Sequence, residues 1–162
     1  MSKTVIIWGS STGTTEEVAN KIAASTGADI FEVTKLTPEL VAGYDTLLLG
    51  SSTWGCGELQ DDWYEGVEKL KKADLKGKRI ALFGLGDSSS YSDTFCDAIG
   101  VIYNELSASG ATFIGQVDAA DYTFDNSASV FDGKFVGLAI DEVNESSKTD
   151  TRIANWIASL AL

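Results

Sequence analysis

The sequence predicts an α/β fold with three layers, in which helices cover both faces of a mainly parallel β-sheet. Short apolar runs rich in β-branched residues alternate along the chain with stretches of helical periodicity. Alternation of this kind is typical of parallel strands joined by right-handed crossovers. In addition, segments rich in Gly, Ser and Thr follow the first, third and fourth apolar runs. Because ligands of parallel sheets bind outside the carboxyl ends of the strands, these loops form the predicted site.

The predicted strands are continuous apolar runs, a pattern typical of strands buried on both faces. They are Thr4–Trp8, Asp29–Val33, Thr46–Leu49, Arg79–Phe83, Ala111–Ile114 and Phe135–Ile140. Residues 117–134 lie between the last two runs and are polar and rich in Asp and Ser. We interpret them as an insertion that splits or follows the last strand.

Four apolar stripes at helical spacing predict the helices. In the first, Thr14 and Glu17 also have the spacing of a capping box. The second follows the candidate caps Asp61 and Asp62. The stripes are Val18 and Ile22; Trp63, Val67 and Leu70; Phe95, Ile99, Ile102 and Leu106; and Ile153, Ile157 and Leu160. Pro38 marks a short connection after the second strand.

Composition restricts the classes of function. The 162 residues include 12 basic and 24 acidic side chains, a formal net charge of −12. Such a charge repels nucleic acid and anionic membranes and favours basic partners, although it could also serve only to keep the protein in solution. The chain has no histidine, which excludes histidine-dependent catalysis and histidine metal sites. Cys56 and Cys96 are too few for a disulfide framework. No run approaches the ~18 apolar residues of a membrane span and no signal segment is evident, so we expect one cytoplasmic domain, residues 1–162.

The segment 9–16 predicts a phosphate site. It joins the first strand to the first helix, where loop N–H and hydroxyl groups donate hydrogen bonds and the helix dipole adds partial positive charge. The loop contains no Lys or Arg, which favours a monophosphate held by neutral donors. It lacks the Lys of a triphosphate-binding loop, two glycines of a dinucleotide fingerprint, and the Cys and Arg of a low-molecular-weight phosphatase. The alternative is simple helix capping. The candidate phosphate ligands are Ser10, Ser11, Thr12, Gly13, Thr14 and Thr15.

The other two loops each combine glycines with one aromatic residue, Trp54 in the loop 50–61 and Tyr91 in the loop 84–93. An aromatic ring among small or polar neighbours suits a wall against a planar ligand, although Trp54 could instead fold back as a lid on the core. Trp8, Trp63 and Trp156 follow strand or helix patterns and are predicted to be core. The three loops together predict a slot for a flat three-ring molecule with a monophosphate tail.

These motifs resemble the flavodoxins, specifically the long-chain type. The matching segments are Ser10 to Thr15, Thr53-Trp54, Gly57-Glu58-Leu59-Gln60 with Trp63, Gly84-Leu85-Gly86-Asp87 with Tyr91, and Gly133 to Leu138. The resemblance implies a five-stranded parallel sheet of order 2-1-3-4-5, noncovalently bound FMN and low-potential one-electron transfer between redox enzymes. Departures include Ser88, where relatives often have Gln, and Trp8, where Phe or Tyr is usual.

The resemblance also implies how the loops meet the cofactor. Trp54 and Tyr91 would stack on the two ring faces, and backbone groups of Gly86 and Asp87 would meet the pyrimidine edge. The carbonyl oxygen of Gly55 would accept a hydrogen bond from the proton newly placed on flavin N5. Besides the phosphate ligands, the predicted cofactor residues are Ser52, Thr53, Trp54, Gly55, Cys56, Gly57, Leu85, Gly86, Asp87 and Tyr91. No catalytic or metal-binding residue is predicted.

We expect an electron carrier rather than a substrate-turnover enzyme. Its expected partners are a reductase donor and an acceptor oxidoreductase with basic docking surfaces, met by a monomer. The acidic residues Asp61, Asp62, Glu65 and Glu68 are equally well interpreted as a docking face or as a solvated helix surface. The alternative function is an FMN-dependent reductase of the quinone or nitro type. A signalling receiver domain is rejected, because Gly and Ser stand where that module needs acidic residues.

Overall fold

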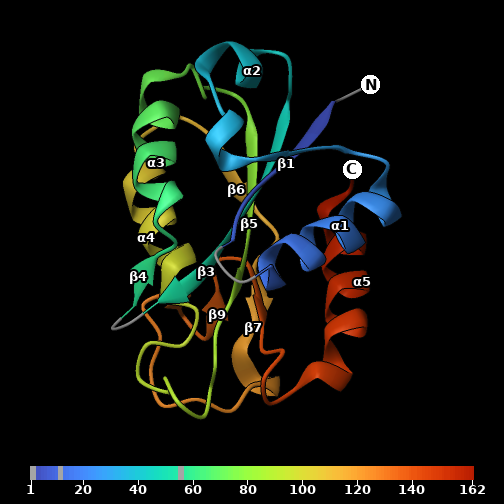
Figure 1. The fold of residues 1–162 in the computed structure, drawn as a ribbon, viewed down its shortest axis with the longest axis vertical. Coiled ribbons are helices and arrows are strands. Elements are labelled where there is room, and N and C mark those ends of the chain that lie inside the picture. Colours follow the sequence, from blue (N-terminus) through green and yellow to red (C-terminus); the bar gives the residue numbers. More distant parts are fainter. Residues whose placement is uncertain (1–2, 11–12, 55–56) are drawn as a thin grey trace.

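The structure is a computed structural model that describes residues 3–10, 13–54 and 57–162. A parallel sheet forms the middle layer, with helices on both faces (Figure 1). Its strand order is β10-β5-β3-β1-β2, which is the predicted order 2-1-3-4-5 when the strands are counted along the chain. These strands are β1 (Thr4–Gly9), β2 (Asp29–Glu32), β3 (Thr46–Trp54), β5 (Arg79–Leu85) and β10 (Leu138–Ile140).

Apolar side chains on the two faces of the sheet form two cores. The helices α3 (Asp62–Lys72) and α4 (Asp97–Leu106) cover the face that carries Val5, Leu47 and Leu82. The helices α1 (Thr14–Thr26) and α5 (Thr149–Leu160) cover the face that carries Ile6, Leu48 and Phe83. Successive residues of each strand therefore point to opposite cores, as continuous apolar runs predict.

The strands next to the site are longer than predicted. β3 continues five residues beyond Leu49, because Gly50, Ser51 and Ser52 extend the ladder to β5. Gly50 has no room for a side chain, since a Cβ there would lie 2.1 Å from the ring of Phe83. A short strand β4 (Glu58–Leu59) pairs antiparallel with the end of β3. The expected loop 50–61 is therefore mostly strand, with a hairpin at its tip.

The run Phe135–Ile140 was predicted as one strand, and this is wrong. Phe135 belongs to β9 (Lys134–Phe135), which lies between β7 (Val117–Asp118) and β8 (Val130–Phe131) in a separate antiparallel sheet. Of the predicted run, only the part in β10 joins the main sheet, where it pairs with the second half of β5. The first half of β5 pairs with β6 (Thr112–Ile114). The backbone at Gly137 lies so close to β5 that a Cβ would be 2.1 Å from the carbonyl oxygen of Leu82.

The predicted capping box of α1 is also wrong. The N-cap is Gly13 in a left-handed conformation (φ 93°), and no side chain caps the helix. The Oγ of Ser10 accepts the N–H of Gly13 at 2.8 Å and forms a turn in the preceding loop. As a result, Thr14 is already the first residue of the helix and is not its cap. In α3, Asp61 is the N-cap by position but makes no side-chain cap bond.

The remaining elements are short. They are helix α2 (Pro38–Ala42), capped by Thr37 where only a connection was expected, and the 3-10 helices Val33–Lys35, Ala119–Asp121 and Ser146–Lys148. Phe95 precedes α4 and packs with Tyr122, Phe124 and Phe135 against the inserted segment. Trp63 and Trp156 are buried as predicted, whereas Trp8 is half-buried. Among the described residues, no helix is long and apolar enough to cross a bilayer.

Candidate functional site

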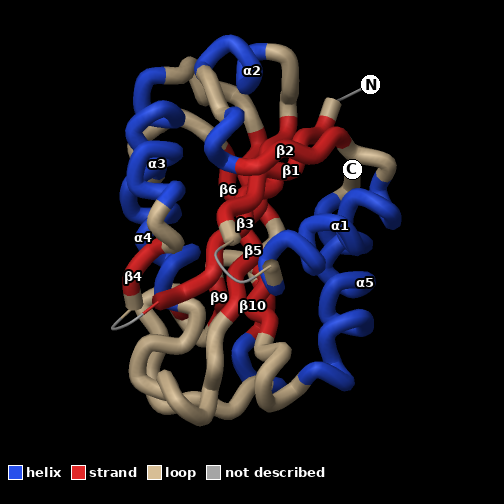
Figure 2. Tube along the Cα trace, viewed as in Figure 1, coloured by secondary structure: helices blue, strands red, loops and turns tan. Residues whose placement is uncertain are grey.

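The loops after β1, β3 and β5 all follow the carboxyl ends of neighbouring strands, on the side of the sheet that faces the lower half of the view in Figure 2. β1, β3 and β5 are neighbours, and Gly9 pairs with Ser51, which in turn pairs with Gly84. Gly9, Ser51 and Gly84 therefore lie at one level of the sheet, and β3 continues three residues beyond it before its loop begins. The predicted site segments are thus brought together by strand register.

The first loop leaves β1 at Gly9 and enters α1. A Cβ at Gly9 would lie 2.4 Å from Oε1 of Gln60 and 2.6 Å from the ring of Trp63, so the backbone passes directly over α3. At Gly13 a Cβ would meet no atom of the described residues within 4 Å, which leaves room beside the helix N-terminus in that part of the chain. The first N–H groups of a helix have no partner within the helix and can bind an anion. Ser11 and Thr12 lie outside the described residues.

Thr15 is buried in the first turn of α1, and its Oγ1 has no hydrogen-bond partner among the described residues. A buried hydroxyl without a partner is costly, so a ligand oxygen here would be stabilising. Thr46 and Thr149 also have such hydroxyls. Thr149 also lies in the first turn of a helix, α5, but it follows the 3-10 helix Ser146–Lys148. Thr15 follows the loop of small residues after β1, one of the three loops of the candidate site.

The second loop is the hairpin between β3 and β4. The Thr53 side chain has a structural role, because its Oγ1 accepts the N–H of Ala98 at 3.1 Å. Gly57 has a φ of 96°, and a Cβ there would lie 2.6 Å from Oδ2 of Asp97. Gly55, Cys56 and the side chain of Trp54 lie outside the described residues, so the predicted aromatic wall and the Gly55 carbonyl stay predictions.

The third loop leaves β5 at Leu85, whose side chain is buried in the core with α1 and α5. The N–H of Gly86 donates to the carbonyl oxygen of Ile140 at 3.0 Å. Asp87 organises the turn, since its Oδ1 accepts the N–H groups of Ser89 and Ser90 at 3.0 Å each. The bond from Ser90 is the largest cause that lowers the pKa of Asp87. Tyr91 is 51% exposed, which leaves its ring open to a ligand.

Sequence reasoning missed two residues beside the third loop, Asp141 and Asn144. Asp141 directly follows β10 and is fully buried, and its carboxylate accepts hydrogen bonds from Ser88 and Asn144. The signal was a carboxylate at the end of the last strand, at the same sheet edge as the predicted loops. It had no distinctive spacing to any motif.

Cys96 is buried at the start of α4, and burial raises the pKa of its thiol well above the usual value. A thiol in this state is a poor nucleophile, because the reactive form is the thiolate. Within the described residues, no cluster of acidic or Cys side chains is arranged to hold a metal ion.

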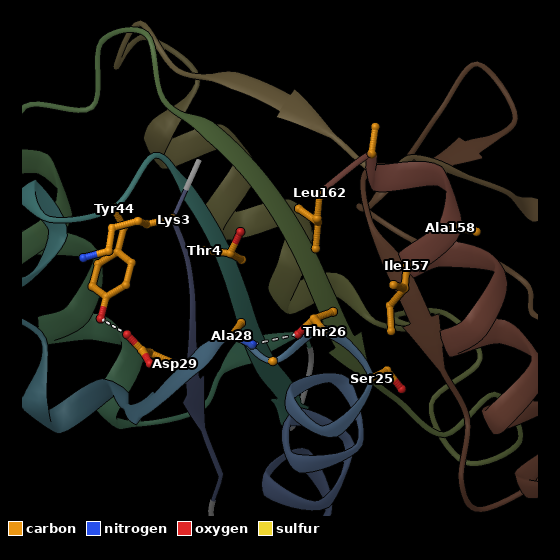
Figure 3. Close-up of a pocket in the computed structure, with 12 residues that line it drawn as sticks. Lys3, Thr4, Ser25, Thr26, Ala28, Asp29, Tyr44, Ile157, Ala158 and Leu162 are labelled. Carbon is orange, nitrogen blue, oxygen red and sulfur yellow. Dashed lines mark hydrogen bonds between the residues drawn. The ribbon is translucent and has the colours of Figure 1, made fainter. Parts of the chain in front are cut away.

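A pocket of about 670 Å³ lies at the opposite edge of the sheet (Figure 3). Lys3 and Tyr44 line one side, and Ile157 and Leu162 line the other, with the Tyr44 hydroxyl donating to Asp29 at 2.6 Å. None of the predicted site residues lines it.

Comparison with known proteins gives similarities over nearly the whole chain. A family model described as flavodoxin matches residues 6–156. Flavodoxin 1 of Azotobacter vinelandii is 43% identical over 167 residues, covering 99% of this chain and 96% of that protein. A Picosynechococcus flavodoxin is 42% identical with the same coverage. The solved structure of Fusobacterium nucleatum flavodoxin bound to flavin mononucleotide has a TM-score of 0.90 at 28% identity, covering 98% of this chain and 96% of that one.

Proposed function

Because the chain belongs to the flavodoxin family, we propose that it is a one-electron carrier that holds FMN noncovalently at the three loops. The observation that carries this proposal is the meeting of these loops at one sheet edge, with a helix N-terminus and the buried Thr15 hydroxyl on the β1 side. FMN combines a monophosphate with a flat ring system, and this edge offers neutral phosphate donors after β1 and an exposed aromatic ring, Tyr91, after β5. The proposal treats residues 1–162 as one FMN-binding domain.

The phosphate would be held by the first loop and by the first turn of α1. The residues proposed to bind it are Ser10, Ser11, Thr12, Gly13, Thr14 and Thr15. The backbone N–H groups donate at the helix N-terminus, and the Thr15 hydroxyl gains the partner that it lacks within the described chain. No basic side chain is needed, because N–H donors and the helix dipole carry the interaction.

The ring system would lie against the second and third loops. The residues proposed to contact it are Ser52, Thr53, Trp54, Gly55, Cys56, Gly57, Leu85, Gly86, Asp87 and Tyr91. Thr53 and Leu85 would do so through their backbone, because the Thr53 hydroxyl bonds to Ala98 and the Leu85 side chain is in the core. Tyr91 and Trp54 would exclude water from the ring faces. The bound FMN supplies the redox chemistry, and the protein tunes it through contacts and nearby charges.

The partners would be a reductase donor and an acceptor oxidoreductase, both with basic docking surfaces. The formal net charge of −12 supports this, because a strong negative field attracts basic surfaces. A monomeric state and a cytoplasmic location stay predictions from the sequence.

Titration of the purified protein with FMN tests the proposal. We expect one FMN per chain, release of the cofactor on unfolding, and reduction in two separate one-electron stages. Failure to take up FMN would contradict the proposal. Steady oxidation of NAD(P)H by the isolated holoprotein would instead favour the reductase alternative.

Two matched variants assign the phosphate end of the site. Thr15→Val removes from the site a buried hydroxyl that has no partner in the described part of the chain. Thr46→Val removes a second such hydroxyl at the start of β3, the end of that strand away from the site. We expect Thr15→Val alone to weaken FMN binding, by about 1–3 kcal/mol for a lost hydrogen bond to a charged group. Equal affinities in the two variants would refute the role of Thr15.

A further inference from the structure

Asp141 is a buried carboxylate that lies between two segments of the site edge. It directly follows β10, whose last residue Ile140 pairs with Leu85 at the end of β5. The third loop begins at this point, and Gly86 donates its N–H to the carbonyl oxygen of Ile140. Asp141 therefore lies beside the start of the loop that the proposed function places against the flavin ring.

The contacts of Asp141 tie that loop to the segment before α5. Its Oδ2 accepts the N–H of Ser88 at 3.3 Å and also the hydroxyl of Ser88. Its Oδ1 accepts the N–H and the Nδ2 of Asn144 at 3.0 and 3.1 Å. Asn144 completes the link, because its Nδ2 also donates to Oδ1 of Asp87 at 2.8 Å. The carboxylates of Asp87 and Asp141 are thus joined through one amide group.

No cation balances this carboxylate in the part of the chain that the structure describes. Asp141 is fully buried, and no Lys or Arg forms an ion pair with it there. Burying a charge without an opposite charge is costly, and only neutral donors offset that cost here. Both oxygens of Asp141 accept hydrogen bonds, from Ser88 at Oδ2 and from Asn144 at Oδ1, and this arrangement of donors favours the ionised carboxylate.

We propose that Asp141 is a positioning residue for the cofactor, which anchors the third loop through Ser88 and Asn144 and whose unbalanced charge makes a bound flavin harder to reduce. This inference rests on the proposed function. An added electron near a fixed negative charge is disfavoured, and the effect is strong where water is excluded. The anchor keeps the backbone of Gly86 and Asp87 in one place while the charge on the ring changes.

The charge is tested with Asp141→Asn and a matched control, Glu39→Gln. Each variant changes the formal net charge by one unit, but Glu39 is exposed on α2, at the end of the molecule opposite the three loops (Figure 1). We expect Asp141→Asn to shift the equilibrium for adding the last electron about tenfold toward the reduced form, which is about 59 mV for one electron. Glu39→Gln should shift it less than twofold. Equal shifts in the two variants would overturn the inference.

The anchor is tested without any cofactor, by amide hydrogen exchange in the apoprotein. Ser88→Ala and Asn144→Ala each keep Asp141 but remove one of its partners. We expect the amides of Ser88, Ser89 and Ser90 to exchange at least tenfold faster in either variant than in the wild type. This test decides the inference if Asp141→Asn fails to fold, and unchanged exchange in both variants would overturn it.

The two proposals fail in different ways. If the wild-type protein takes up no FMN, the proposed function is wrong, and the inference about the potential is wrong with it. If the wild type binds FMN but Asp141→Asn matches Glu39→Gln, only the inference is wrong.

Discussion

Gly13 and Gly27 flank α1. Substituting each by alanine distinguishes an effect of backbone strain from an effect on ligand binding. Both have left-handed backbones, with φ of 93° and 70°, and a Cβ at either would meet none of the structurally described residues within 4 Å. Alanine should therefore cost each site a similar strain of about 1–2 kcal/mol. Only Gly13 lies at the helix N-terminus, where the phosphate is proposed to bind. We expect both variants to lose similar stability in denaturant unfolding and Gly13→Ala alone to bind FMN more weakly. Equal FMN affinities would place the phosphate elsewhere.

The role of a residue near the site could be predicted where the local sequence pattern indicates it. Examples are Trp63, which belongs to an apolar helical stripe, and the glycines of the loops. Asp141 and Asn144 could not, because their roles depend on the register that brings β10 beside β5. The capping box failed for a related reason. Ser10 and Gly13 set the start of α1 through a turn that residue spacing alone does not reveal.

Tyr122 provides one of the many polar links between the inserted segment and the rest of the fold. The half-buried Tyr122 donates its hydroxyl to the carbonyl oxygen of Ala139 in β10 at 2.8 Å. Its ring also lies under the guanidinium of Arg152 on α5, 3.8 Å away. Tyr122→Phe keeps the ring and removes the hydrogen bond, so we expect a loss of about 1 kcal/mol in the free energy of unfolding.

The control for this element is Tyr64→Phe. Tyr64 is 51% exposed on α3, and its hydroxyl makes no hydrogen bond with the described part of the chain. We expect no measurable change in chemical denaturation for this variant. A loss as large as that of Tyr122→Phe would mean that the Ala139 contact does not hold the insertion.

The elements of the main sheet were largely predictable, because buried parallel strands are continuous apolar runs. Their ends were not. β3 and β5 continue into residues rich in Gly and Ser, whose backbones pair although their composition is typical of loops. The run Phe135–Ile140 failed because apolar character does not say which sheet a residue joins. Phe135 is apolar because it packs against Tyr122 of the insertion and against Phe95, which precedes α4.

At the scale of the whole molecule, the strand order and the confirmed family agree with the expectations from sequence, because the motif loops and the apolar runs point to the same topology. The net charge of −12 has a separate consequence for association. Exposed charges act over about one Debye length, ~10 Å at 0.1 M salt. Electron transfer from the reduced protein to a basic acceptor should therefore slow steeply as salt rises.

Stopped-flow measurement with a small basic haem protein as acceptor tests this, with a neutral small-molecule acceptor as the control. Steering by opposite charge raises association rates by about 10–10³-fold at low salt. The rate with the basic acceptor should therefore lose most of this enhancement between low and high ionic strength, and the rate with the neutral acceptor should change little. Asp61→Asn at the N-cap of α3 and Glu39→Gln on α2 remove one exposed charge each. If α3 is the docking face, Asp61→Asn should slow the reaction more than Glu39→Gln. Equal slowing would mean that the total charge, rather than a local face, attracts the partner.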